Sequence, residues 1–347
     1  MKLSSIRRLL LALILSILSV ASFAASTDLP KELPKELRIG FQKSSVNLTL
    51  LKHRQALEQQ LKDVKVTWFE FTAGQQMLEA LSVGSIDFAT TGEPPPIFAQ
   101  AAGSNLVYVG AEPAKPGVSA ILVKPDSTIC TLADLKGKKI AIQKGSSAHY
   151  HVLRAVQQAG LQWSDITPVY LAPADARAAF ERGSVDVWAI WDPYWAAIEQ
   201  SAAPRILATG KGLVNNLSHY LSARSFADKY PKVIQVLFEE LTRSDTFVQK
   251  NRDEAVAIIA ASTGLDKPTI ASFLERRPRS PVVYFTQNIV DEQQRVADNF
   301  YQQKLIPKAV NVRDAVWLPP RLRLPQIPRV MTAYSCPLAA LAKMPGW

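Results

Sequence analysis

The sequence predicts an α/β protein of two lobes with largely parallel sheets, and three observations lead to this prediction. A set of short segments occurs twice, about a hundred residues apart. Within each copy, short apolar runs alternate with amphipathic stretches, as strands and helices do in α/β domains. The chain of 347 residues is also long enough for two domains once an N-terminal leader is set aside.

Residues 1–24 have the pattern of a secretory signal peptide. Three basic residues form a cationic start, and the stretch 9–20 is almost wholly apolar. This stretch is shorter than the roughly 20 apolar residues that span a bilayer, and small residues precede a cleavage point after Ala24. No cysteine follows that could carry a lipid, so we expect a cleaved, soluble protein in the periplasm.

The repeated segments agree in both order and spacing. The matching pairs are 37–45 with 139–147, 84–88 with 183–187, and Glu93-Pro94 with Asp192-Pro193. A single α/β domain that repeats common turn chemistry is the alternative explanation. Because three features agree in order and spacing, we favour an internal duplication with one copy in each lobe.

Matching helices and strands are expected in the two copies. The predicted helices are 75–81 and 174–182, and the predicted strands are 86–90 and 185–190. The chain is expected to cross between the lobes near 107–116 and 219–223. The second lobe, 116–219, is then inserted in the first, which comprises 25–115 plus 220–318 and is closed by a helical C-terminal part.

The formal charge of +10 does not indicate a nucleic-acid ligand, because much of it lies at the two ends of the chain. The leader carries three basic residues, and residues 319–347 carry four with no acid, which leaves +3 for the body. The body contains no basic stripe interleaved with aromatic residues. We therefore expect no nucleic-acid partner.

The cysteines and histidines give no metal, cofactor or catalytic signature. Cys130 lies in the body and Cys336 in the terminal segment, and we expect them to be unpaired rather than a structural disulfide. His149 and His151 are two positions apart, so on a helix they point in different directions. We expect no metal and no cofactor.

A ligand site is expected where strands end and helices begin. In open α/β sheets the ligand lies beyond the carboxyl ends of the strands, and helix N-termini expose N–H groups that bind oxyanions. The motifs at these positions are Ser44-Ser45, Thr72 to Gln75, Thr90 to Gly92 and Ser146-Ser147. None contains arginine, so we expect neutral donors and helix dipoles to hold a permanent monoanion such as a sulfonate. The simpler alternative is that the serines only cap their helices.

The aromatic segment 187–195 follows the last predicted strand. We expect Trp191 to lie in the cleft and pack against an alkyl chain. Glu93 and Asp192 would repel an anion, so each is expected to anchor its own turn, with an amine on the ligand as an alternative partner for Asp192.

Four segments together resemble the aliphatic sulfonate-binding proteins of ABC transporters, within the nitrate/sulfonate/taurine-binding group. The segments are 70–81, 143–147, 173–180 and 188–194, and the resemblance extends from residue 37 to 317. It implies a type II periplasmic binding protein fold with a hinge and an interlobe cleft, and docking onto a permease with a cytoplasmic ATPase. Carried over by position, it implies the ligand-binding residues Gln42, Gly74, Gln75, Thr91, Gly92, Gly145, Ser146, Ser147, Trp191 and Asp192.

This chain departs from the family in two places. Ser44 stands where the family commonly has glycine, and the resemblance stops after Pro320. We expect the segment 319–347 to be a disordered extension. The protein is expected to be a monomer and not an enzyme. The alternatives are a taurine- or nitrate-binding protein, or an enzyme similar to thiamine-precursor synthases with a reactive His149 in the cleft.

Overall fold

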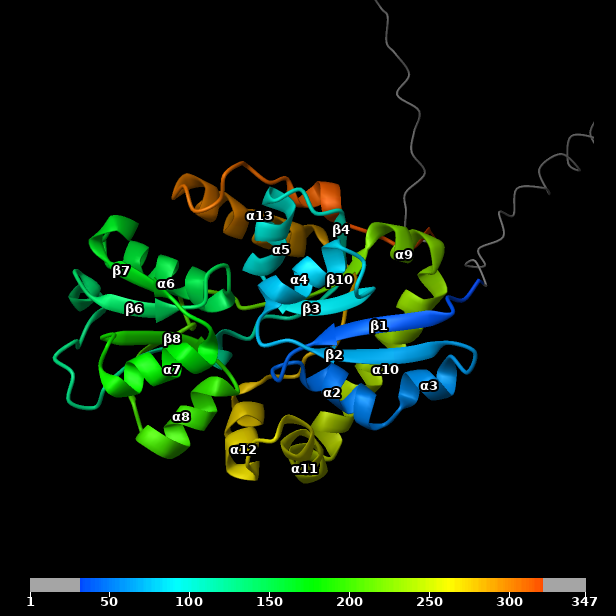
Figure 1. Cartoon of the computed structure of the whole chain (residues 1–347), viewed down its shortest axis with the longest axis horizontal. Coiled ribbons are helices and arrows are strands. Elements are labelled where there is room, and N and C mark those ends of the chain that lie inside the picture. The colour runs from blue at the N-terminus through cyan, green and yellow to red at the C-terminus, as the bar shows by residue number, and fades with distance from the viewer. Residues whose placement is uncertain (1–31, 321–347) are drawn as a thin grey trace, which may run out of the picture.

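The computed structural model describes residues 32–320 as two lobes that lie side by side, each built on a five-stranded sheet (Figure 1). The predicted signal peptide and nearly all of the 319–347 extension lie outside the described residues. Within the described part, no helix combines the length and the apolar character needed to cross a membrane.

The first sheet has the strand order β2-β1-β3-β10-β4. Its strands are β1 (Glu36–Phe41), β2 (Lys65–Glu70), β3 (Phe88–Gly92), β4 (Leu106–Glu112) and β10 (Ser218–Ala223). β1 pairs in parallel with β2 and β3, whereas β10 runs antiparallel to β3 and β4. Four strands therefore share one direction, and the fifth returns from the other lobe.

The second sheet repeats this arrangement in the order β7-β6-β8-β5-β9. Its strands are β5 (Ser119–Val123), β6 (Lys139–Ile142), β7 (Thr167–Tyr170), β8 (Val187–Trp191) and β9 (Arg205–Thr209). β6 pairs in parallel with β7 and β8, and β5 runs antiparallel to β8 and β9. The single reversed strand occupies the same place in both sheets, as a duplication predicts, and the predicted fold class is confirmed.

Helices cover both faces of each sheet (Figure 1). Those packed on the first sheet or closing it are α2 (Val46–His53), α3 (Ala56–Gln60), α4 (Gly74–Ser82), α5 (Pro94–Ala101), α9 (Arg224–Lys229), α10 (Pro231–Lys250), α11 (Arg252–Thr263), α12 (Lys267–Arg276) and α13 (Gln287–Gln302). Those on the second sheet are α6 (Ser147–Gln158), α7 (Pro173–Arg182) and α8 (Tyr194–Ala202). Four short 3₁₀ turns are η1 (Pro116–Val118), η2 (Leu132–Leu135), η3 (Trp163–Asp165) and η4 (Val312–Ala315).

The predicted helices fall on α4 and α7, but both predicted strands begin later than expected. β3 starts at residue 88 and β8 at residue 187, each directly after an aspartate. Asp87 accepts a hydrogen bond from the backbone N–H of Arg38 at 2.9 Å, and Asp186 accepts one from Lys139 at 2.8 Å. In both lobes the aspartate closes the turn onto the neighbouring strand, so the strand can begin only after it.

Three large hydrophobic clusters stabilise the two lobes, and a smaller one lies where they meet. The second lobe buries one cluster around its sheet, and the first lobe buries one on each face of its own, of which one also includes Tyr150 and Leu153 of α6. In the smaller cluster, Val46 and Leu50 of α2 and residues of α10, α11 and α12 pack with Ala196 of α8. Helix α12 therefore lies against both lobes below their junction (Figure 1).

The chain crosses between the lobes twice, after β4 and before β10. The crossing segments approach each other, since the backbone N–H of Lys115 donates to the carbonyl of Asn215 at 2.8 Å. Two adjacent crossings are what a hinge requires. The exact boundaries given above for the lobes, 25–115 plus 220–318 and 116–219, stay a prediction.

Candidate functional site

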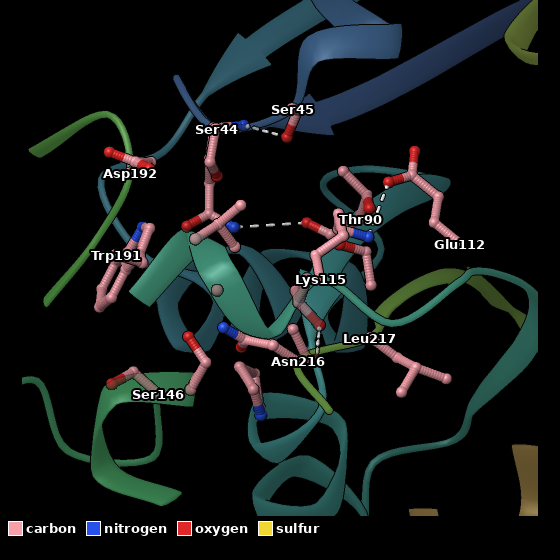
Figure 2. A pocket seen from close by; sticks show the side chains of 18 of the residues that line it. Ser44, Ser45, Thr90, Glu112, Lys115, Ser146, Trp191, Asp192, Asn216 and Leu217 are labelled. Atoms are coloured by element: carbon pink, nitrogen blue, oxygen red, sulfur yellow. Dashed lines mark hydrogen bonds and ion pairs between the residues drawn. The ribbon is translucent and has the colours of Figure 1, made fainter. Parts of the chain in front are cut away.

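One pocket lies between the lobes, at the carboxyl ends of β1, β3 and β8 (Figure 2). Its lining includes, from the first lobe, Gln42, Ser44, Ser45, Gly74, Thr90, Thr91, Gly92, Pro95, Glu112 and Tyr220; from the second lobe, Ser146, Ser147, Trp191 and Asp192; and from the crossing segments, Lys115, Val118, Asn216 and Leu217. The C-terminal helical part adds Phe273 and Arg277. A ligand here contacts both lobes at once.

Eight of the ten residues predicted from the sequence line this pocket. They are Gln42, Gly74, Thr91, Gly92, Ser146, Ser147, Trp191 and Asp192. The other two, Gln75 and Gly145, lie beside it: a Cβ placed on Gly145 would be 3.4 Å from Oε1 of Gln75. Gln75 follows Gly74 by one helical position and is rotated by about 100° away from the pocket. It lines a neighbouring surface groove together with Lys144.

Two helix starts of the first lobe reach the pocket without a side-chain cap. Neither α2 nor α4 has a side-chain hydrogen bond at its N-terminus. The hydroxyl of Ser45, which precedes α2, instead accepts from the backbone N–H of Gln42 at 3.0 Å. In α2 the first N–H, that of Val46, donates to the carbonyl of Ser44 at 3.0 Å. The other first-turn N–H groups of the two helices are left to other acceptors, with the positive end of each helix dipole behind them.

The helix start of the second lobe is capped. Ser146 Oγ accepts from the backbone N–H of His149 at 3.3 Å and donates to the carbonyl of Gln143 at 2.7 Å. The simpler alternative, an N-cap, is thus correct for Ser146. Ser147 follows as the first residue of α6, and its hydroxyl has no hydrogen-bond partner among residues 32–320. Of the two serines, Ser147 has the hydroxyl that is free for a ligand.

Glycine is required at one position in the pocket and allows close approach at another. A Cβ on Gly74 would be 2.9 Å from both Thr91 Cγ2 and Pro95 Cγ, so any side chain there would displace the start of α4. A Cβ on Gly92 would be 3.4 Å from the Cβ of Ser147 in the opposite lobe. The lobes therefore face each other at van der Waals distance across this part of the cleft.

Trp191 and Asp192 line the second-lobe side of the pocket (Figure 2). The Asp192 side chain is fully buried; one oxygen accepts from the N–H of Ala196 at 3.0 Å, which agrees with the expectation that it anchors its own turn. Arg276 at the end of α12 also donates to both carboxylate oxygens, at 2.8 and 2.9 Å. Burial raises the pKa of Asp192, and the Arg276 guanidinium opposes that rise.

Arg276 has further contacts with α8. A third nitrogen donates to Glu199 at 2.8 Å, and the guanidinium lies 3.8 Å from the ring centroid of Trp195. These contacts tie α12 to the second lobe directly behind the pocket. The sequence reasoning missed this residue.

Glu93 behaves differently from what we expected. It precedes α5, but its side chain does not cap that helix, and neither carboxylate oxygen has a hydrogen-bond partner among the described residues. The expectation that Glu93 anchors its turn is therefore wrong. Burial raises its pKa to about 8, and the nearby charge of Lys115 opposes that rise without cancelling it. At neutral pH this carboxyl is mostly uncharged.

The expectation that only neutral donors line the cleft is also wrong, because a buried charged cluster forms part of its wall. Glu112 Oε2 accepts from Lys115 Nζ at 3.1 Å, and Oε1 accepts from Tyr220 at 2.7 Å and Asn47 at 2.8 Å. Burial alone would raise the pKa of Glu112, but Lys115 and Arg277 outweigh it and hold the pKa below its ordinary value.

The repeated sequence motifs do not predict this charged cluster. Glu112 ends β4, Lys115 lies in the first crossing segment, and Arg277 directly follows α12, far along the chain. The one available signal is the pair Arg276-Arg277 before Pro278, which is two cations at a helix end.

No described histidine is among the residues that line the pocket, and neither is Cys130. His149 is fully buried, its Nδ1 accepts from the N–H of Gly145 at 3.1 Å, and its ring lies among Trp163 and Phe300 at 5.1 Å. Burial lowers its pKa to about 3. Among residues 32–320 no group of three or more metal-ligating side chains comes together, and Cys130 is free and exposed. Cys336, its possible partner, lies outside the described residues.

Two similar lobes, a double crossing and a polar cleft at their junction define a two-lobed ligand-binding protein. The model of the family described as NMT1/THI5 like matches residues 60–264. A relative from Escherichia coli K12, whose name assigns it to the aliphatic sulfonates-binding proteins, is 47% identical over 311 residues, which cover 90% of this chain and 97% of the relative. The chain belongs to the NMT1/THI5-like family and to the family of that relative.

Solved structures agree with this assignment. The alkanesulfonate-binding protein SsuA from Xanthomonas axonopodis pv. citri, bound to MOPS, has a TM-score of 0.79 and 44% identity, covering 82% of this chain and 99% of its own. The periplasmic aliphatic sulphonate binding protein SsuA from Escherichia coli has a TM-score of 0.78 and 48% identity, covering 85% and 96%. These relatives are binding proteins, which confirms the prediction that this chain is not an enzyme.

Proposed function

We propose that this protein captures aliphatic sulfonates in the periplasm as the substrate-binding component of an ABC importer. The observation that carries the proposal is the convergence, in one cleft, of eight residues from the two sequence copies. A monomer of this kind would close on its ligand and then dock onto a permease with a cytoplasmic ATPase. The signal peptide over residues 1–24 would direct it to that compartment.

The contacts suggest how the ligand is held. Free N–H groups at the starts of α2 and α4, with the hydroxyls of Thr91 and Ser147, would donate to the sulfonate oxygens. The face of Trp191 would pack along the alkyl chain. Gln75 and Gly145 would not contact the ligand; they would support the loop that leads into α6 from outside the pocket.

Two alternatives concern the ligand of this same cleft. Taurine carries an ammonium group, and its expected partner Asp192 is already engaged by Arg276 and by the N–H of Ala196. Nitrate has no alkyl chain to contact Trp191. A sulfonate without an amine on its chain suits the cleft better than either. The relative bound to MOPS supports a sulfonate head group on an alkyl chain. Because MOPS also carries a morpholine nitrogen, the choice against an amine rests on the contacts of Asp192 alone.

The enzyme alternative requires a reactive side chain in the cleft. Its candidate, His149, is buried among aromatic rings and does not line the pocket. With a pKa of about 3 it would stay neutral, and no substrate could reach it without unfolding its surroundings.

Titration calorimetry of the native protein tests the proposal. Ethanesulfonate to hexanesulfonate would be titrated alongside taurine, nitrate and sulfate. We expect a sulfonate Kd of about 1 μM, equivalent to about −8 kcal/mol, and weaker binding of the other three. No heat from any sulfonate, or tighter binding of nitrate or taurine, would contradict it.

The compartment and the assembly state are tested separately. The intact mass of the protein isolated from its native host should correspond to a chain that begins at Ala25. Light scattering should give the mass of one chain, with and without ethanesulfonate. A retained leader would contradict the proposed processing, and a mass of two chains would contradict the monomer.

A further inference from the structure

Arg277 enters the cleft from the end of α12 and is almost completely buried. Its side chain is 3% exposed, and it lines the pocket together with residues of both lobes. The residue before it, Arg276, points the other way, into α8 of the second lobe. The two consecutive arginines thus lie in different surroundings.

The guanidinium of Arg277 has ion-pair neighbours but few hydrogen bonds. Nη1 lies 3.4 Å from Asp245 Oδ1, and Nη2 lies 3.6 Å from Glu112 Oε2. At 3.6 Å no hydrogen bond forms, and Nη2 has no hydrogen-bond partner anywhere in the described part of the chain. By contrast, Nε, Nη1 and Nη2 of Arg276 all donate to carboxylates at 2.8 to 2.9 Å.

Most carboxylate oxygens around Arg277 already accept from other donors, and the exception, Asp245 Oδ2, has no hydrogen-bond partner among the described residues. Glu112 accepts from Asn47, Tyr220 and Lys115, and Asp245 Oδ1 accepts from the backbone N–H of Ser280 at 2.8 Å. These acids hold the guanidinium in place without satisfying Nη2. A buried charged donor without an acceptor is costly, and such a group facing a pocket indicates an acceptor that arrives with the ligand.

We propose that Arg277 donates a hydrogen bond from Nη2 to an oxygen of the bound sulfonate, as the cationic member of the anion site. This inference rests on the proposed function of the cleft. A charge-assisted bond in a site shielded from water is stronger than one from a neutral donor, so Arg277 would contribute a large share of the affinity for the head group. The alkyl chain would be recognised independently at Trp191.

The test is a calorimetric comparison of the native protein with Arg277→Met across ethane-, propane- and butanesulfonate. We expect the variant to bind all three about 10- to 100-fold more weakly, the range for a hydrogen bond to a charged group. The increase in affinity with each methylene added to the ligand's alkyl chain should be the same in the variant as in the native protein. A purely structural role for Arg277 would distort the wall of the cleft and change that gain.

Arg279→Met is the matched control. Arg279 lies 3.7 Å from the same Asp245, but it is 70% exposed and does not line the pocket. Its variant should bind all three sulfonates within about 2-fold of the native protein, because an exposed ion pair contributes little.

If Arg277→Met fails to fold, the double variant Arg277→Met with Asp245→Asn is measured instead, because it removes both members of the buried ion pair. Arg277→Lys, which keeps the charge without the planar fork, should lose less affinity than the Met variant. Unchanged sulfonate affinity in the Met or double variant, or a changed gain per methylene, would overturn the inference. Absence of sulfonate binding by the native protein would instead reject the proposed function.

Discussion

Asp192 and Glu93 occupy equivalent positions in the two lobes, yet the protein stabilises them in different ways. Each follows the central strand of its sheet, precedes a proline, and is 1% exposed. Asp192 keeps a guanidinium against both of its oxygens, whereas Glu93 has no hydrogen-bond partner among the described residues and a pKa raised to about 8. One acid is neutralised by a cation and the other by a proton.

The difference shows that the backbone of the duplicated lobes has been kept while the surroundings of the matching side chains have diverged. Helix α12, which lies outside the duplicated segments, packs against the second lobe and brings Arg276 to Asp192. No described cation forms an ion pair with Glu93; Lys115, which pairs with Glu112, opposes the rise in the pKa of Glu93 without cancelling it. Both arrangements keep an uncompensated negative charge away from the cleft, which an anion-binding site requires.

The largest expected effect comes from removing the cation of the paired acid. Arg276→Met should lower the free energy of unfolding by about 3 to 5 kcal/mol, because it leaves the buried Asp192 without a counter-ion. Urea unfolding followed by circular dichroism measures this loss. Arg177→Met is the control, since Arg177 pairs with Glu181 on the surface of α7 and should cost under about 1 kcal/mol. Equal losses in the two variants would contradict the comparison.

The second effect concerns the unpaired acid. Folded Glu93 keeps its proton up to a pH of about 8, whereas the unfolded chain releases it above about 4.5. The folded state therefore binds more protons, and stability is lost as pH rises between these values, by at most about 1.4 kcal/mol per pH unit. Glu93→Gln should remove this loss, so its stability relative to the native protein should rise from pH 4.5 to 8 and level off above. A pH-independent difference between the two unfolding curves would show that Glu93 is ionised in the fold.

The smallest effect extends the comparison to the two adjacent serines at the start of α6. Ser146→Ala removes a helix cap and should cost about 1 kcal/mol of stability. Ser147→Ala removes a hydroxyl with no partner among residues 32–320, so it should leave stability unchanged while weakening sulfonate binding. Thermal melting and calorimetry on both variants separate the two roles. Reduced stability of Ser147→Ala with unchanged affinity would reverse this assignment.

Much of the fold was predictable because it depends on local patterns. The matching segments 84–88 and 183–187 indicated the duplication, and the amphipathic stretches 75–81 and 174–182 indicated the helices that became α4 and α7. The boundaries of β3 and β8 were misplaced because the aspartate side chains take backbone partners from neighbouring strands, and sequence spacing does not reveal these contacts.

The candidate site was predictable where its residues belong to the repeated motifs. Gly74, Thr91, Ser147 and Trp191 follow strands or begin helices, and the topology brings such positions together. Arg276 and Arg277 were missed because they come from a helix outside the duplication, whose packing against both lobes depends on the tertiary fold. Glu93 was misjudged because its sequence context resembles that of Asp192, and only the structure shows that no described side chain donates to its carboxylate.

A crystal structure of the protein grown with ethanesulfonate tests the central claim most directly. The account predicts that the sulfonate lies between the starts of α2 and α4 in the first lobe and Ser147 in the second, with its ethyl group against Trp191. Density for the ligand on one lobe alone, or outside the cleft, would contradict it.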